Sequence, residues 1–122
     1  MTKAHYANLN KLNEQITVDF NGVVLAESNN VILLSEVYKD KEYPAVMYFP
    51  RTDVNIDLFS KVENMSTHCP IKGAASYYNL HVDGENIEQA AWSYEDTLPD
   101  SDNIKEYLAF DTSKFNPDFI ST

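Results

Sequence analysis

The chain has 122 residues, of which 43% are hydrophobic and 12% aromatic, and its formal net charge is −10 at pH 7. Nine cationic residues against nineteen acidic ones leave no strongly positive face. A nucleic acid or an anionic membrane requires such a face, so we expect neither as a partner. A chain of this length is most simply one domain. We expect it to span 1–122, with an N-terminal extension (1–15), a core (16–111) and a C-terminal tail (112–122).

Cysteine content and hydropathy bear on location. The single cysteine, Cys69, cannot form an internal disulfide, so nothing indicates an oxidising compartment. The first fifteen residues lack the apolar run of a signal peptide, and no stretch approaches the roughly 18 apolar residues of a membrane-spanning helix. These features predict a cytoplasmic protein.

The first half of the chain contains several strand patterns. Before Ile16, the spacing of Tyr6, Leu9 and Leu12 suits one loose helical turn. The β-rich runs "ITVDF" and "VVLAES" flank "NG", the dipeptide that a type I′ hairpin turn prefers. The mostly apolar runs "NNVILLSEVY" and "AVMYFP" predict two further strands, and "VNIDLFSKV" alternates apolar with polar residues as a half-buried strand does.

The second half predicts another hairpin and one helix. "ASYYNLHV" and "IEQAAWSYE" are joined by Asp83 and Gly84, again a hairpin signal. Pro99 and the acidic "DSDN" favour a short C-terminal helix over "NIKEYLAF", capped by Ser101 or Asp102. The predicted fold class is therefore mainly β: a single domain of antiparallel strands with a short C-terminal helix.

The segment "YFPRTDV" contains the only arginine of the chain, Arg51. In an extended backbone Arg51 and Asp53 would share one side. Arg51 could then clamp a carboxylate or phosphate bidentately, with Asp53 as a general base. The alternative is an ion pair, with Glu36 or Glu95, that only fixes the loop.

The segment "THCPIKGAASYY" is either part of an active site or a structural turn between two strands. Cys69 could be a nucleophile whose thiolate is favoured by Lys72 and His68. Adjacent strand residues point to opposite faces, however, which places His68 poorly as a base for its neighbour. In the alternative, Cys69 is a buried structural residue in a tight turn to which Gly73 supplies a positive φ. Lys72 is then either a ligand contact or a solvated side chain.

Aromatic residues alternate in "AAWSYE". Trp92 and Tyr94 fall on one face of this predicted strand, and Glu95 falls on the other. The two rings either pack in the core or form the wall of a pocket, where a phenol such as that of Tyr78 supplies a hydrogen bond. One cysteine and three histidines are too few for a closed zinc site, so we expect no metal and no cofactor, although a mixed site at His68 is an alternative.

These segments resemble a bacterial and fungal family known as domain of unknown function four-two-seven, over about residues 18–110. The resemblance implies an antiparallel β fold of a tent-like or open-barrel kind, and no established activity. A nucleotidyltransferase-like label attached to the family is set aside, because the chain has no Gly-Ser turn for a triphosphate. Its one Asp-x-Asp pair falls at the expected helix cap. The matching residues are Asn21-Gly22, Ala26, Ser28, Glu36, Tyr48, Pro50-Arg51, Asp53-Val54, Thr67, Cys69-Pro70, Lys72-Gly73, Ala75-Ser76-Tyr77, Ala91-Trp92, Tyr94-Glu95 and Ala109-Phe110.

Three hypotheses follow. In the first, the domain binds a small organic anion and acts on it by acid–base chemistry. In the second, it is a non-catalytic protein-interaction module, and in the third a cysteine-dependent enzyme. The sequence does not decide between a monomer and a homodimer. The first hypothesis requires one site, with candidate acid–base residues Asp53, Tyr78 and Glu95 and with ligand contacts from Arg51, His68, Lys72, Trp92 and Tyr94.

Overall fold

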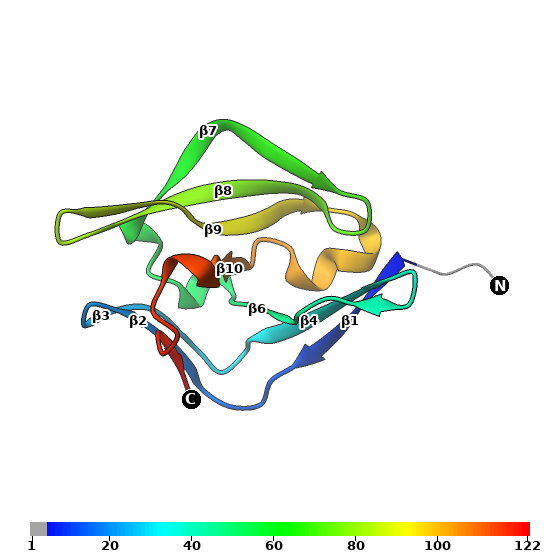
Figure 1. Cartoon of the computed structure of the whole chain (residues 1–122), viewed down its shortest axis with the longest axis horizontal. Helices are drawn as coiled ribbons and strands as arrows, with labels where there is room; N and C mark the ends of the chain where they lie inside the picture. The colour runs from blue at the N-terminus through cyan, green and yellow to red at the C-terminus, as the bar shows by residue number, and fades with distance from the viewer. Residues whose placement is uncertain (1–4) are drawn as a thin grey trace.

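In the computed structural model, which describes residues 5–122, the strands form three antiparallel sheets. Figure 1 shows β7, β8 and β9 as one layer, and β1 to β4 as the opposite layer, with β6 and β10 between them. Two backbone hydrogen bonds between Phe49 and Leu108, of 2.7 and 2.8 Å, join the layers through the ends of β6 and β10. The fold is therefore mainly β and antiparallel, as predicted.

The largest sheet carries most of the predicted site residues. Its strand order is β10-β9-β8-β7. Its core is the β8–β9 hairpin, whose turn residues Asp83 and Gly84 have φ angles of 50° and 81°. Positive φ at both positions is what a type I′ turn requires, so the predicted hairpin is confirmed. The bounds of the strands are Phe59–Cys69 for β7, Gly73–Val82 for β8, Glu85–Thr97 for β9 and Leu108–Phe110 for β10.

The second sheet contains the other predicted hairpin. Asn21 and Gly22 have φ angles of 52° and 81° and join β2 to β3, which confirms this turn as well. The C-terminal strand β11 pairs with the free side of β2. The bounds are Ile16–Phe20 for β2, Val23–Ser28 for β3 and Ile120–Ser121 for β11.

The third sheet corrects the expectation of a helical turn near the N-terminus. Residues 5–11 form strand β1, in which His5, Ala7 and Leu9 are partly buried and their neighbours are exposed. A period of two is a strand pattern, and the whole of β1 pairs with β4. The bounds are His5–Lys11 for β1, Ile32–Tyr38 for β4, Lys41–Glu42 for β5 and Val46–Tyr48 for β6.

The predicted C-terminal helix over 103–110 is wrong. A 3-10 helix, η3 (Pro99–Ile104), covers only the first two residues of that range, and Glu106 has a positive φ of 65° that no helix continues through. Leu108, Ala109 and Phe110 are buried instead as β10, paired with β9. The helix-compatible local sequence is overridden by burial of this apolar triplet between the layers.

Other short helices replace predicted strand. Arg51–Asp53 forms the 3-10 helix η1, so this segment is not extended as expected. In "VNIDLFSKV", Ile56–Leu58 forms η2, and only the part from Phe59 onward is strand. The fourth 3-10 helix, η4, covers Thr112–Lys114.

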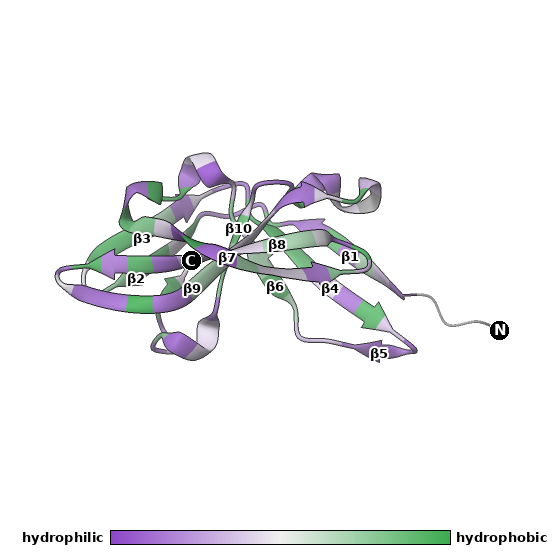
Figure 2. Cartoon of the chain, turned by 90° about the horizontal axis from the view of Figure 1, so that it is seen from above, coloured by the Kyte–Doolittle hydropathy of each residue, from purple (hydrophilic) through white to green (hydrophobic). Residues whose placement is uncertain are grey.

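Hydrophobic residues gather on the strands in the middle of the molecule, whereas β5 and the outer turns are hydrophilic (Figure 2). The buried residues form two clusters. The larger lies between β2, β3 and the β8–β9 hairpin and includes Leu25, Phe49 and Phe110. The smaller includes Leu34, Tyr48 and Tyr94. Within residues 5–122, no helix is long and apolar enough to span a membrane.

Candidate functional site

Lys72 lies in the turn between β7 and β8, and two hydrogen bonds join this turn to the segment after β9. The carbonyl of Lys72 accepts a hydrogen bond of 3.1 Å from the backbone N–H of Leu98, and the carbonyl of Ile71 accepts one of 2.8 Å from the hydroxyl of Ser101. The next residue, Gly73, has a φ of 113°, as its expected role in the turn requires. The result is a lysine that is only 8% exposed.

The ammonium of Lys72 can donate three hydrogen bonds but has fewer acceptors around it. It donates a hydrogen bond of 3.1 Å to Glu36 Oε1 and lies 5.2 Å from the centre of the Tyr94 ring. Burial opposes its charge, but the nearby oxygens of Tyr48, Tyr94 and Glu36 outweigh this effect and raise the pKa of Lys72 above its ordinary value. Lys72 is therefore charged near neutral pH. Within residues 5–122, Glu36 is its one hydrogen-bond acceptor, which leaves two of three N–H groups without one.

These N–H groups adjoin a hollow of about 360 Å³, which we call the polar hollow. Two of its phenols, like Lys72, have unused hydrogen-bonding capacity among the described residues. Tyr48 is fully buried, and its hydroxyl accepts a 3.2 Å hydrogen bond from Trp92 Nε1 but has no acceptor for its own proton. The hydroxyl of Tyr94 has no partner there. The hollow is lined by Val46, Tyr48, Lys72, Tyr77, Gln89, Trp92, Tyr94 and Asp111.

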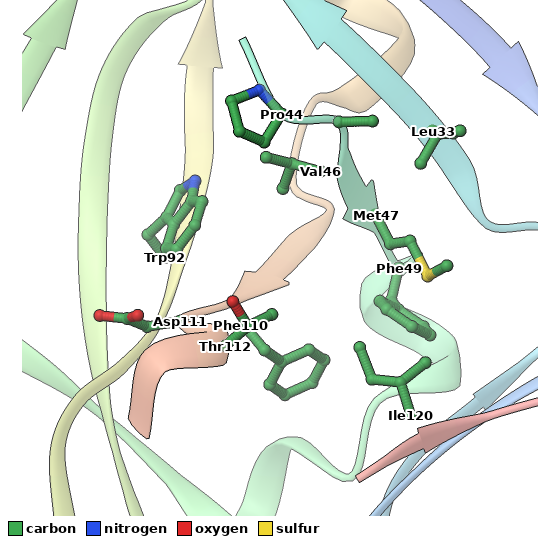
Figure 3. A pocket seen from close by; sticks show the side chains of 11 residues that line it. Leu33, Pro44, Val46, Met47, Phe49, Trp92, Phe110, Asp111, Thr112 and Ile120 are labelled. Carbon is green, nitrogen blue, oxygen red and sulfur yellow. The ribbon is translucent and has the colours of Figure 1, made fainter. Parts of the chain in front are cut away.

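A second hollow, of about 300 Å³, adjoins the first and is mainly apolar. The two share Val46, Trp92 and Asp111. Figure 3 shows Trp92 and Asp111 on one side of this apolar hollow, facing Val46 and Met47 across it. Its full lining is Leu33, Pro44, Ala45, Val46, Met47, Phe49, Trp92, Phe110, Asp111, Thr112 and Ile120.

Arg51, Tyr78 and Glu95 form a separate cluster. Arg51 Nη2 lies 2.8 Å from Glu95 Oε2 and 3.2 Å from the hydroxyl of Tyr78, which also donates a hydrogen bond to Glu95. The other carboxylate oxygen of Glu95 accepts a 2.8 Å hydrogen bond from Lys61. The ion pair with Glu95 is one of the two that the sequence suggested for Arg51.

The protonation states of this cluster follow from its contacts. Burial disfavours the charged form of Glu95, but the hydrogen bonds from Lys61 and Tyr78 and the charges of Lys61 and Arg51 lower its pKa below the usual range. Burial and the hydrogen bond to Glu95 raise the pKa of Tyr78. Near neutral pH the cluster thus holds a carboxylate between two cations, with a neutral phenol beside it.

The two groups lie on opposite faces of the β8–β9 hairpin. Residues directly paired in antiparallel strands point to the same face. Tyr77 is paired with Trp92 on the face of the polar hollow. Tyr78 is paired with Ala91 on the other face, where its hydroxyl meets Arg51. Arg51 and Lys72 therefore do not converge on one ligand.

Asp53 is in neither group. Its carboxylate accepts a 2.6 Å hydrogen bond from the hydroxyl of Ser28, which in turn accepts one of 2.9 Å from the backbone N–H of Asn30. Because η1 is helical, Asp53 turns toward β3 while Arg51 turns toward β9. This contact fixes η1 to the end of β3.

Cys69 and His68 end strand β7 outside both groups. The side chain of Cys69 is partly buried among the residues of the smaller hydrophobic cluster, whereas His68 is exposed. No hydrogen bond joins either side chain to another described residue. Within residues 5–122 no three histidine, cysteine, aspartate or glutamate side chains are grouped as metal ligands.

Several lining residues were not among those expected from the sequence. Tyr48 lies within an apolar strand, and a phenol in such a place is a signal that a polar partner is near. Asp111 precedes Thr112 and Ser113 and accepts hydrogen bonds from the backbone N–H and hydroxyl of Ser113, as an N-cap residue does. The sequence gives no comparable signal for Gln89, which lies at a register shift between β8 and β9.

One protein family matches most of the chain. The profile of a family described as "Domain of unknown function (DUF427)" matches residues 8–118. The chain belongs to this family. The match begins within β1 and ends next to β11, so it is longer at both ends than the resemblance over 18–110 indicated. No curated protein sequence matches the chain.

Proposed function

We propose that the domain binds a small organic anion in the polar hollow, with Lys72 as the anion contact. The observation that carries the proposal is the ammonium of Lys72, which is almost buried and has one protein acceptor for three donors. A buried ammonium with unused donors is costly unless a further acceptor arrives. The hydroxyls of Tyr48 and Tyr94 add two more donors. A carboxylate or similar oxyanion would satisfy this set.

The rest of the ligand is apolar in this proposal. Trp92 and Tyr77 offer ring surfaces along the polar hollow, and the adjoining hollow contributes Met47, Phe49 and Phe110. Ligand sites commonly combine an apolar wall with a few converging polar groups. An acid with an aliphatic or aromatic body fits both parts.

Binding is proposed here without an acid–base step. Tyr78 and Glu95 were expected as acid–base groups, but they lie on the opposite face of the hairpin. Asp53 contacts Ser28. Lys72 and Tyr94, whose pKa values are both raised, are hydrogen-bond donors near neutral pH rather than bases. The acid–base enzyme therefore has little support from this geometry.

Native mass spectrometry with matched compounds tests the proposal. The purified chain is mixed with straight-chain carboxylic acids of four to ten carbons, and separately with the alcohols of the same lengths. We expect the chain to retain acids and not alcohols, because only the acids can pair with Lys72. Equal retention of acids and alcohols, or retention of neither, would contradict the proposal.

The non-catalytic interaction module is the second candidate. The observation in its favour is that Arg51 and Lys72 are each already paired with a glutamate, as purely structural cations would be. On this account Lys72 matters for stability alone, and no acid changes the melting temperature. The cysteine-dependent enzyme gains no support, because no base among the described residues is hydrogen-bonded to Cys69.

Two further expectations belong with this proposal. We infer a tent-like arrangement of the sheets from the family resemblance, and a cytoplasmic location from the single cysteine, which cannot form an internal disulfide. The charge of −10 disfavours a nucleic acid or an anionic membrane as the partner, so we expect a small molecule in that location.

A further inference from the structure

The polar hollow has a second pole, opposite Lys72. At this end Asp111 Oδ1 accepts two hydrogen bonds from Ser113, of 3.1 Å from its backbone N–H and 2.6 Å from its hydroxyl. Asp111 Oδ2 accepts no hydrogen bond from the described residues; its nearest cation is Lys114, at 3.7 Å. The side-chain amide of Gln89 lines the same end and is also without a partner there. This end offers acceptors, whereas the Lys72 end offers donors.

The strand β9 sets the two poles apart. The backbone N–H of Asp111 donates a 2.8 Å hydrogen bond to the carbonyl of Ala90, while Lys72 lies against the ring of Tyr94. Four residues of strand separate Ala90 from Tyr94, or roughly 13 Å between their Cα atoms. Trp92 lies midway and lines both hollows. A ligand that reached both poles would therefore lie along the face of Trp92.

We propose that the ligand is bipolar, with an oxyanion at Lys72, a protonated amine at Asp111 and an apolar middle along Trp92. This inference rests on the proposed function, since it assigns the second end of the same ligand. Zwitterionic amino acids with a separated amine are the chemical class that fits.

The charge of the whole molecule supports the same class. With a net charge of −10, the chain repels a monoanion before it reaches Lys72. A zwitterion has no net charge and avoids this repulsion. The positive charge of Lys114 would repel an amine at Asp111. The ammonium of Lys114, however, donates hydrogen bonds to the carbonyls of Glu88 and Gln89, at 2.8 and 3.1 Å, which holds it on the exposed side.

Calorimetric titration of the full chain separates the two ends of the ligand. The probes are ω-amino acids of six and eight carbons, the unsubstituted acids of the same lengths, and the corresponding alkylamines. We expect the ω-amino acid of the better length to bind about tenfold more tightly than its matched acid, because it adds one charge-assisted hydrogen bond at Asp111 Oδ2. The amines alone should bind weakest.

Two variants test whether Asp111 causes the preference for the ω-amino acid. Asp111→Asn keeps an oxygen that can accept from Ser113 but removes the charge, so the tenfold preference for the ω-amino acid over the plain acid should fall to about one. Asp57→Asn, an exposed carboxylate in η2, removes the same charge elsewhere and should keep the preference. Thermal melts confirm that both variants are folded under the conditions of titration.

The outcomes distinguish the two proposals. If the plain acids bind through Lys72 but the ω-amino acids bind no more tightly, the bipolar ligand is wrong and anion binding stands. A preference that survives Asp111→Asn would also overturn the bipolar ligand. If neither the acids nor the ω-amino acids bind, both proposals are wrong.

Discussion

The guanidinium of Arg51 lies 2.8 Å from the carboxylate of Glu95, on the face of β9 opposite the one that carries Trp92 and Tyr94. This pair fixes η1 to the large sheet. The only arginine of the chain is therefore engaged in joining two elements. The buried lysine on the other face is left as the cation with spare donors.

Replacing Arg51 with Lys should lower stability and leave ligand binding unchanged. Lysine cannot hold Glu95, Tyr78 and Ser93 from one planar group as Arg51 does. Because the pair is about one-quarter exposed, we expect the free energy of unfolding to fall by about 1 kcal/mol. Thermal and denaturant melts measure this loss, and octanoate titration measures binding.

Lys61→Met is the matched control for Arg51→Lys. It removes the other cation at Glu95. Because the side chain of Lys61 is 55% exposed, its loss should lower stability less than Arg51→Lys does. If Arg51→Lys weakened octanoate binding tenfold without changing the melting temperature, Arg51 would be a ligand clamp after all.

Stability should decrease at acidic pH through the two paired glutamates. The pKa of Glu95 is lowered by Lys61, Tyr78 and Arg51 against the opposing effect of burial, and that of Glu36 by His5 and Lys72 in the same way. A carboxyl group with a lowered folded-state pKa stabilises the fold above its unfolded pKa, near 4.5. This contribution is lost as the pH falls through the folded value.

Denaturant melts between pH 7 and pH 3 measure this dependence. Glu95→Gln should flatten the decline below about pH 4.5, because the variant has no carboxyl group to protonate at this position. Glu85→Gln serves as the control, because this exposed carboxylate at the start of β9 accepts a hydrogen bond from Asn21 but pairs with no cation among the described residues. An equally steep decline in wild type and Glu95→Gln would show that the pairing of Glu95 contributes no pH-dependent stability.

Gly73→Ala should destabilise the turn that holds Lys72. A Cβ atom at this position would lie 2.5 Å from the carbonyl oxygen of Asp96 and 3.2 Å from Thr97 Cα, and the φ of 113° disfavours any side chain. We expect a loss of more than about 2 kcal/mol in the free energy of unfolding.

Gly22→Ala separates the two effects that destabilise Gly73→Ala, the steric contact of the new Cβ and the unfavourable φ. Gly22 also has a positive φ, of 81°, but an added Cβ would meet no atom within 4 Å. Its replacement should cost about 1 kcal/mol, from backbone conformation alone. Similar losses for the two variants would mean that the close approach of Gly73 to β9 does not matter.

The elements that the sequence predicts correctly are those specified locally. "NG" and "DG" determine both hairpin turns through the positive φ that each requires. Alternation also placed Trp92 and Tyr94 on one face of β9 and Glu95 on the other. In each case the information lies within a few neighbouring residues.

The wrong predictions fall on segments whose structure depends on residues far away in the sequence. Strand β1 pairs with β4, whose residues come more than twenty positions later. The residues of β1 alone do not reveal this partner, and their apolar spacing suggested a helical turn instead. The helix predicted over 103–110 failed because β10 is buried between two layers. Local propensity is a weak guide where tertiary packing is this strong.

In the candidate site, too, some residues were predicted from local sequence and others depended on distant contacts. Lys72, Trp92 and Tyr94 were expected as ligand contacts, and the structure brings them to one hollow. Arg51 was expected beside them, but the helical turn of η1 directs it to the other face. No local feature of "PRTD" predicts on which face of a distant sheet its side chains will lie.

Calorimetric titration of octanoate into wild type, Lys72→Met and Lys61→Met tests the central claim most directly. Each variant removes one glutamate-paired lysine, on opposite faces of the β8–β9 hairpin. With all three proteins folded at the temperature of titration, we predict that Lys72→Met weakens octanoate binding about tenfold or more and that Lys61→Met changes it less than about twofold. Equal affinity in wild type and Lys72→Met, or no binding to wild type, would contradict the claim that Lys72 receives an organic anion.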